Sequence, residues 1–497
     1  MSPEVCNSSR RSSSGYSGFI LLALVALIGM SAVGCGGSSA GIGSTGSNLS
    51  GSTAVTVLGT STANAQLTAF FVDLEGISLT NKAGKTVTLL STPLYTEFVH
   101  LNGQVEPLAT ATIPQDTYTS ATVTVGTSQF TCIGLQPSGN LLSVAEFSDS
   151  QVNAAQVTVT LPQPITVTGS SMGVALNLAA PQSASFPSGC SFSGIPAFSI
   201  TPNFTLSAVP VVAQPTNATN GKAAMLFGTV SALNASQTQV TVTGSADSPV
   251  WNATINSNTV FQGIGGVGQL ALGIPVELDA TLQQDGSLLA ARIAVSDTNA
   301  TNATIFAGPI FLVADYRTEL DIYNAQMAGY LDKEGTLPET AADYSNAQFK
   351  ISGAMGNLAT LPFAASFTAA NMAPGQNVSM TTHSTNNLGG LTPVDTITLV
   401  PQTLDGKVSA IAAEGGFTKY TIQLASYDLF PVAAVEEYHI SPLTTPNVVV
   451  VYADSNTQNP NSTPVAVGSV ARFYGLVFND NGTLRMDCAQ INSGVTL

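Results

Sequence analysis

Short stretches in which apolar residues alternate with Thr, Ser or Gln recur along most of this chain. Clear examples are Thr68–Thr80, Lys85–Leu90, Ser120–Gly126, Gln156–Leu161 and Val448–Asp454. Alternation with a period of two is typical of strands that bury one face against a core and expose the other. The pattern therefore predicts an all-β protein, built largely from antiparallel strands.

Turn-forming residues separate these stretches. They occur at Asn81–Gly84, Asp285–Gly286, Asp405–Gly406 and Asn479–Gly482. Asp-Gly and Asn-Gly pairs supply the positive φ angles of tight hairpins, so we predict a hairpin turn at each place. One stretch, Asp315–Gly335, mixes charged and apolar residues without alternation. It predicts either a short helix or a longer excursion.

The second half of the chain contains an internal repeat. Two segments open with Gly-x-Val-Ser-Ala, at Gly228 and Gly406, and each continues to a second glycine, a hairpin turn and a strand with an isoleucine. The later positions are Gly273 and Ile293 in the first copy and Gly468 and Ile491 in the last. A looser copy between them has Gly308, Gly375 and Ile397. Copies of this length exceed solenoid repeats and predict a string of small β-domains.

These patterns divide the chain into seven parts. We expect a signal peptide at 1–34, a Gly/Ser-rich tether at 35–62 and an N-terminal antiparallel β-sandwich at 63–212. A Pro/Asn/Gly-rich linker follows at 213–221. Three tandem barrel-like or sandwich-like β repeats then occupy 222–298, 299–402 (the divergent copy) and 403–497.

The N-terminus has the features of an export signal. Arg10 and Arg11 precede the apolar run Phe19–Met30, and small residues lead to Cys35. This order predicts a cleaved secretory signal. An uncleaved signal-anchor is the alternative, although the run is shorter than the roughly 20 apolar residues of a comfortable membrane span.

The cysteine after the small residues resembles the acylation site of a bacterial lipoprotein, although Ala32 stands where that pattern usually has Leu. The resemblance implies that Cys35 is lipidated and becomes the new N-terminus. The uncharged stretch Gly36–Thr53 predicts a flexible tether behind that anchor. Gly36, in place of Asp, resembles lipoproteins sent to an outer membrane. We therefore expect an exported protein, lipid-anchored to the cell envelope at the outer membrane or cell surface.

Charge is sparse and mostly negative. Charged residues make up 8 % of the chain, against about 25 % in typical soluble domains, and the formal net charge is −16. Such a chain lacks the basic surface of a nucleic-acid binder, so we expect no nucleic-acid partner. We expect the lipid on Cys35 to make the contact with the membrane. An envelope polymer or a protein remains a candidate partner.

The cysteines fit an oxidising compartment. The chain has five, and Cys6 precedes the predicted cleavage site. Cys132 and Cys190 fall in one predicted domain, where a disulfide is the default after export. Two separate buried thiols are the alternative. Cys488 lies in an alternating stretch and is interpreted as a small buried core residue.

Few residues suggest chemistry. Of the three histidines, His100, His383 and His439, only the last has a nearby acidic partner on the same predicted strand face, Glu437. A metal site needs about three converging ligands, and the neighbouring sequence does not supply the others. A solvated strand is the simpler interpretation.

Other acidic positions carry equally simple interpretations. Asp73 and Glu75 alternate on one strand and suggest either a calcium pair or an exposed face. Asp454 and Asp480 lie in fragments that lack the distal Glu of a calcium loop and fit turns better. The single Trp251 does not make an aromatic platform. We therefore expect no cofactor, no metal site and no catalytic residues.

Two segments resemble uncharacterised bacterial β-domain families. Phe70–Gly126 resembles a domain of exported lipoproteins that carries an element like Ile113–Tyr118, with Asp116 where that family tends to have Gly. The repeats resemble a second small β-domain, best at Gly273–Leu278 and Gly286–Ile293. The shared positions are turn glycines and strand residues, so the resemblance implies fold and location but no reaction.

The sequence thus favours a non-enzymatic, membrane-anchored protein with a structural, adhesive or ligand-presenting role at the envelope. The alternative is a surface protein that binds carbohydrate or another polymer through exposed aromatics. A hydrolase whose site is assembled from distant loops is the least favoured interpretation.

Overall fold

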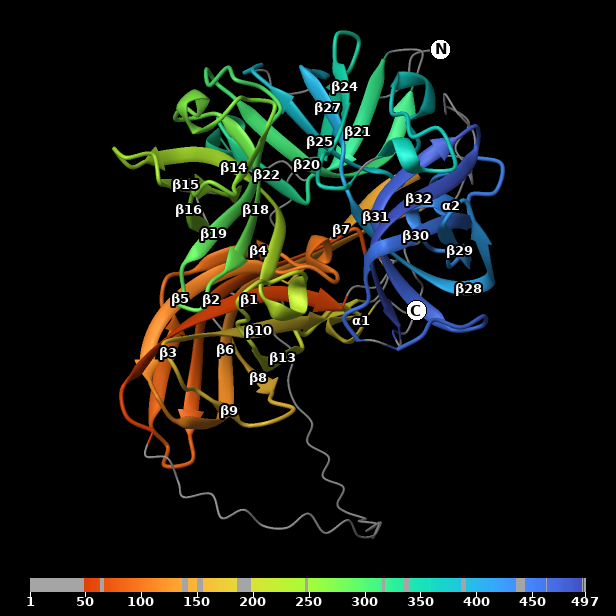
Figure 1. The fold of residues 1–497 in the computed structure, drawn as a ribbon. Coiled ribbons are helices and arrows are strands. Elements are labelled where there is room, and N and C mark those ends of the chain that lie inside the picture. Colours follow the sequence, from red (N-terminus) through yellow and green to blue (C-terminus); the bar gives the residue numbers. More distant parts are fainter. Residues whose placement is uncertain are drawn as a thin grey trace, which may run out of the picture. The chain divides into compact units, whose positions relative to one another are not determined.

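The structure is a computed structural model of the 497-residue chain. It describes residues 49–495 except for 63–66, 136–141, 150–154, 186–197, 246–248, 315–317, 335–338, 357, 386–389, 435–442, 462 and 494. Strands dominate these residues (Figure 1). The α-helices among them, α1 (Ala180–Ser183) and α2 (Leu429–Ala433), are one turn long. The predicted all-β class is confirmed. No helix within the described ranges is long and apolar enough to span a membrane.

The first sheet contains eleven strands. Its main path is β3-β2-β6-β8-β13-β10-β1-β5, with β4 beside β2 and with β7 and β9 beside β6. The strands are β1 (Ser52–Thr62), β2 (Ala69–Asn81), β3 (Thr86–Leu90), β4 (Leu94–Glu97), β5 (Glu106–Pro114), β6 (Thr117–Leu135), β7 (Leu142–Asp149), β8 (Ala155–Thr160), β9 (Ile165–Thr166), β10 (Ser171–Ala179) and β13 (Phe204–Val209). The short strands β11 (Ala184–Ser185) and β12 (Ser199–Ile200) pair separately.

This first sheet curls over its own apolar face. The end strands of the path, β3 and β5, pack against each other. Alternate residues of β2, β6, β10 and β13 meet in one core that includes the fully buried Phe70, Phe130, Leu176 and Phe204. Most neighbouring strands are antiparallel, as expected for the N-terminal domain. β1 and β8 differ, because they pair in parallel with β10 and β13 respectively.

The predicted tether is too long at its C-terminal end. Residues Ser52–Thr62, predicted to belong to the 35–62 tether, form β1 between β5 and β10. Seven residues of β1 are buried, including Val55 and Val57. The Gly/Ser-rich composition before Ser52 masked the alternation of Thr with apolar residues that begins there.

The second sheet closes into a ring. β14 (Lys222–Leu233) pairs with β15 (Gln239–Thr243), which pairs with β16 (Val250–Thr254). On its other side β14 pairs with β18 (Pro275–Leu282) and β18 with β19 (Leu288–Val295). A parallel pairing between β16 and β19 completes the ring, and β17 (Val260–Gln262) continues the parallel pairing further along β19. The short 3-10 helices η2 (Ala218–Asn220) and η4 (Val267–Gln269) flank these strands.

The same topology recurs twice. In the last sheet, β28, β29, β30, β32 and β31 form a closed barrel in the order of the first ring. In the middle sheet, β20, β21, β23, β27 and β25 correspond in that order, and β26, just before β27, supplies the parallel pairing to β23. The last sheet contains β28 (Gln402–Glu414), β29 (Phe417–Gln423), β30 (Val448–Gln458), β31 (Val470–Asp480) and β32 (Thr483–Ser493).

The remaining elements belong to the middle sheet and its connections. They are β20 (Thr304–Ala314), β21 (Glu319–Tyr323), β22 (Gln326–Gly329), η6 (Leu331–Glu334), β23 (Glu339–Asp343), β24 (Gln348–Ile351), η7 (Leu358–Thr360), η8 (Ala369–Asn371), β25 (Asn377–Thr382), β26 (Thr392–Pro393) and β27 (Thr396–Leu399). The described part of the stretch expected to hold a short helix or an excursion, residues 318–334, forms two strands and a 3-10 helix.

A bulge in the first strand of each ring explains the repeated glycines. The strand register shifts just after Val230, Ile310 and Val408, two residues beyond the first glycine of each copy. At each bulge the residue's carbonyl accepts a hydrogen bond from the second glycine, at 2.7–2.8 Å. The glycines that donate these bonds, Gly273, Gly375 and Gly468, have φ of +83°, +96° and +91°. Glycine adopts this left-handed region without strain, and so it recurs there.

Most predicted turns occur where expected, but one does not. Gly84, Gly286 and Gly482 all have positive φ in hairpin turns. Asp405–Gly406, in contrast, lies within strand β28. Gly406 is there because Ile422 of the neighbouring strand packs within 3.0 Å of the position that its Cβ would take. A glycine required for close packing has the same local sequence as one required for a turn.

The bulge glycines lead to a stability prediction. In Gly468→Ala the new Cβ meets no neighbouring atom, so the only cost is that alanine must adopt the left-handed backbone conformation. We expect this to lower the free energy of unfolding by about 1–3 kcal/mol. Ala in place of Gly375 would also press its Cβ into the ring of Phe430, so the loss of unfolding free energy should be larger. Chemical denaturation measures both.

Gly268→Ala is the matched control, because Gly268 has no positive φ and open space around its Cβ position. It should leave stability unchanged or slightly higher. Equal losses at Gly268 and Gly468 would contradict the role given to the left-handed glycines.

Candidate functional site

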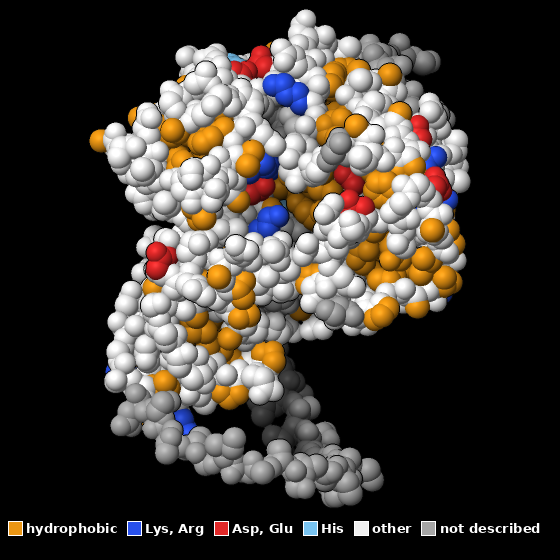
Figure 2. Space-filling view, in the orientation of Figure 1, with side chains coloured by type: hydrophobic (Ala, Val, Ile, Leu, Met, Phe, Trp, Pro, Cys, Tyr) orange, Lys and Arg blue, Asp and Glu red, His pale blue; other side chains and the backbone are white. Residues whose placement is uncertain are grey.

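A cavity of about 180 Å³ lies where the four sheets meet. Its walls come from the 3-10 helix η1 (Val99–Leu101), from β14, from β20 and β22, and from β28, α2 and β31. Figure 2 shows a recess between the regions of β22 and β31 that holds charged side chains of both signs, on a face that is otherwise mostly uncharged. A junction of separately folded units is a common place for a ligand site.

Most of the wall is apolar, and polar groups enter it from three sides. Its apolar part includes Leu101, Leu226, Phe227, Val400 and Leu429. Its ionisable members are His100, Glu106, Asp405, Asp428 and Tyr474. None of these five residues was predicted from the sequence to belong to a site. Only His100 was among the residues considered as possible metal ligands.

Glu97 builds the first side of the cavity. This residue ends β4 and is 4 % exposed. One carboxylate oxygen accepts backbone hydrogen bonds from Phe70 and Val99 at 2.7 and 2.6 Å, and the other accepts from the backbone N–H of His100 at 2.8 Å. These bonds satisfy the first N–H groups of η1, which no helix bond can reach. The carboxylate thereby fixes the turn that lines the cavity.

His100 joins two buried carboxylates. Its Nδ1 is 2.8 Å from Glu97 and its Nε2 is 3.4 Å from Glu106, which is also 3.4 Å from the side-chain amide of Gln326 in β22. Burial disfavours the imidazolium, but the hydrogen bonds and charges of Glu106 and Glu97 outweigh it and raise the pKa of His100 to about 9. His100 is therefore a cation at neutral pH, with both ring nitrogens engaged.

The last ring supplies the second side. Arg472 of β31 donates two parallel hydrogen bonds of 2.9 Å to the carboxylate of Asp405 in β28. Both side chains are less than 10 % exposed. Next to this pair, the hydroxyl of Thr403 donates to the carbonyl of Asn102, just after η1, at 2.8 Å. The pair and the hydroxyl bond tie the last ring to the N-terminal sheet at the cavity.

Asp428 differs from the other carboxylates because it has no cationic partner among the described residues. It is 7 % exposed and precedes α2, where it accepts the N–H of Phe430 at 3.3 Å. Burial raises its pKa to about 7, against that backbone bond, and the charge of Asp405 adds to the rise. A carboxyl in this state gains free energy from any cation that reaches it.

The first ring supplies a strained wall. Met225 has φ of +61°, which is uncommon outside glycine. Its N–H donates to Asp279 at 3.0 Å, and its sulfur accepts from the hydroxyl of Tyr474 at 3.0 Å. Asp279 is in turn held by the buried Arg292 at 2.8 Å. The strained residue is thus secured on both sides.

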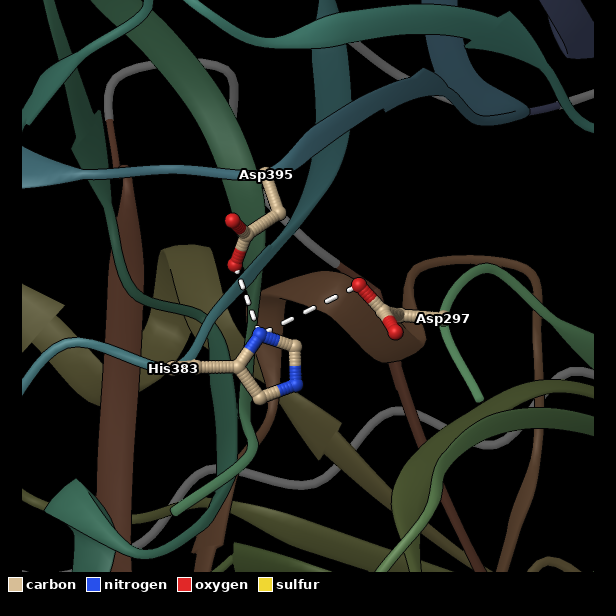
Figure 3. A group of neighbouring side chains, drawn as sticks. All are labelled: Asp297, His383 and Asp395. Atoms are coloured by element: carbon tan, nitrogen blue, oxygen red, sulfur yellow. Dashed lines mark hydrogen bonds and ion pairs between the residues drawn. The ribbon is translucent and has the colours of Figure 1, made fainter. Parts of the chain in front are cut away.

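Outside the cavity, the structure brings three distant residues together. His383, just after β25, lies between Asp395 and Asp297, and both contacts in Figure 3 end at the same ring nitrogen. The cluster includes His383, for which no acidic partner was predicted from the sequence. Burial opposes its charge, but a backbone bond to Asn299 and the two carboxylates raise the pKa of His383.

The residues that the sequence singled out lie elsewhere. Trp251 is buried, and its indole N–H donates to the carbonyl of Pro107 at 3.0 Å. Cys488 is 4 % exposed, and burial raises the pKa of its thiol. Asp73 and Glu75 do face the same space, opposite Gly126, and the charge of Asp73 raises the pKa of Glu75.

Other sequence predictions fall outside the described residues. These are the signal peptide, Cys35, Cys190, Glu437 and His439. Cys132 is buried in β6. The Cys132–Cys190 disulfide stays a prediction, as does lipidation.

Comparison with known families identifies one part of the chain. Residues 227–294 match the model of a domain of unknown function, DUF5666. The match begins in β14 and ends in β19, so it covers the first ring. No curated protein matches the chain. The expectation of an uncharacterised β-domain is confirmed for this ring, and the family expected for Phe70–Gly126 stays a prediction.

His100 makes stability depend on pH. Its folded-state pKa of about 9 exceeds the ordinary 6.5, so its contribution is complete below about pH 6.5 and is lost as pH rises through about 9. The shift corresponds to at most about 3 kcal/mol. Denaturation between pH 6 and 9.5 should show this loss, and His100→Gln should flatten it. A variant profile parallel to that of the unmodified chain would contradict the assignment.

Proposed function

We propose that this protein is a non-enzymatic exported lipoprotein whose β-domains present a binding site for a small organic cation at the cell envelope. The observation that carries the proposal is the junction cavity, in which a buried, cation-free carboxyl faces apolar walls. The membrane anchor would be Cys35, at the end of the export signal. The short tether before Ser52 would hold the domains close to that membrane.

Charge favours a cationic ligand. Glu106 and Asp405 already have positive partners in His100 and Arg472. Burial raises the pKa of Asp428 to about 7, so its ionised form is populated near neutral pH without a cationic side chain beside it. A ligand ammonium would pair with that charge, and its apolar part would fill the remaining wall. A cavity of about 150 Å³ suffices for benzene, so about 180 Å³ admits a small ring with an amine.

Three of the five ionisable groups of the cavity, His100, Asp405 and Tyr474, favour binding over catalysis. A general base must be unprotonated near neutral pH. His100, with a pKa of about 9 and two carboxylate partners, does not meet that condition. Burial raises the pKa of Tyr474 as well. Asp405 is occupied by Arg472.

The surface offers less support for polymer binding. Among the described residues, the large exposed hydrophobic side chains are Phe198 and five aliphatic ones. Stacking on sugar rings uses exposed Trp or Tyr, and Trp251 is buried. We therefore propose no polymer site.

The ligand proposal is tested with two probes of equal shape. Benzylamine carries an ammonium, and benzyl alcohol has a hydroxyl in its place. Benzylamine should raise the melting temperature of the chain more than benzyl alcohol at equal concentration. The difference should disappear in Asp428→Asn, because the amide keeps the size of the side chain but removes its charge.

Asp454→Asn is the matched control, because Asp454 is an exposed residue of β30 that accepts backbone hydrogen bonds from Asn456 and Thr457. It should leave the response to benzylamine intact. Equal responses to both probes, or a benzylamine response that survives Asp428→Asn, would contradict the cation site.

The anchor is tested by Cys35→Ala. The unmodified chain should fractionate with membranes and carry the mass of a lipidated N-terminus. The variant should lose that mass and leave the processed membrane pool. If the variant stays fully membrane-bound at the same mass as the unmodified chain, the lipoprotein proposal is wrong.

A further inference from the structure

A second site is formed by Asp297, His383 and Asp395. Nδ1 of His383 is 2.8 Å from Oδ2 of Asp395 and 3.9 Å from Oδ2 of Asp297. One donor atom from each residue lies within 4.8 Å of the other two (Figure 3). We propose that these three side chains bind a divalent transition-metal ion, with Zn²⁺ the best match to one nitrogen and two oxygen donors.

The histidine ring is oriented as a metal ligand. Its Nε2 is 2.8 Å from the backbone carbonyl oxygen of Asn299, which can only accept, so the proton is on Nε2. Nδ1 is then the ring atom that faces both carboxylates. A backbone carbonyl behind the ring is the usual outer partner of a metal-bound histidine. His100 differs, because carboxylates occupy both of its nitrogens.

The carboxylates are held by their own backbones. Asp395 lies between β26 and β27, where its N–H donates to Thr381 at 2.8 Å and its carbonyl accepts from Gln348 at 2.9 Å. In Asp297, Oδ1 accepts the N–H of Asn299 at 2.8 Å, which leaves Oδ2 toward the ring. The three ligands thus come from the connection between the first two rings and from two places in the middle sheet.

The spacing fits a small ion after minor side-chain rotation. Zinc bonds of about 2.0–2.2 Å in a tetrahedron place donor atoms about 3.4 Å apart. The separations of 2.8 and 3.9 Å between Nδ1 of His383 and the two carboxylate oxygens lie on either side of that value. The side chain of Asp395 is 48 % exposed, so an ion can enter from solvent and keep a water as its fourth ligand. Calcium needs six to eight oxygens, and the site supplies fewer.

The site is tested by titrating Zn²⁺ into the intact chain by calorimetry. We expect one site per chain, weakened at least tenfold by His383→Ala and also by Asp297→Asn or Asp395→Asn. The two amide variants keep the shape of the side chains, so they test the ligands even if His383→Ala folds poorly. Co²⁺ should give visible absorption bands of a nitrogen-containing site, and these should vanish in His383→Ala.

Asp454→Asn serves as the control and should bind Zn²⁺ as the unmodified chain does. Three results would overturn the proposal. These are no saturable Zn²⁺ binding at millimolar concentration, equal affinity in His383→Ala and both amide variants, or Ca²⁺ binding as tight as that of Zn²⁺. Because the cluster lies apart from the cavity, failure here leaves the organic-cation proposal unaffected.

Discussion

A charged side chain removed from water needs a partner of opposite charge, and this requirement organises the junction of the four sheets. Removing one partner of a buried pair typically costs about 3–5 kcal/mol, because the other charge is left stranded. The chain has few charges, yet Arg292, Arg472 and His100 are all largely buried against carboxylates. Each of these groups lies at or next to a contact between sheets. The sparse charge thus serves to hold the rings and the N-terminal sheet together more than to solvate the surface.

The repeated bulge provides the framework for this junction. Three rings share one topology and one left-handed glycine after the bulge, so their backbones present equivalent edges. Their side chains differ. In the middle ring Gly308 and Gly375 line the cavity, and the missing side chain of Gly375 leaves room for Phe430 of α2. The cavity therefore forms because the three rings carry different side chains on similar backbones. Asp428, just before α2, lies in its wall.

Much of this fold could be predicted from the sequence, because alternation and turn glycines are local signals. The strands at Thr68–Thr80 and Val448–Asp454 and the repeat glycines all lie in the expected elements. Asp405–Gly406 was misassigned, since local sequence does not distinguish a packing glycine from a turn glycine. The two candidate sites were harder to predict from the sequence. His100 lies close to Glu97 and Glu106 in sequence, and that spacing was a usable signal. Asp297, His383 and Asp395 are brought together only by strand pairing between distant segments.

The central claim is that the carboxylate of Asp428 binds a cation inside a mostly apolar cavity. A crystal structure of the chain grown with benzylamine tests it most directly. The account predicts density for the ring against Leu226 and Leu429 and the ammonium within about 3 Å of the Asp428 carboxylate. An empty cavity at saturating benzylamine, or a ring bound with its ammonium directed away from Asp428, would contradict it.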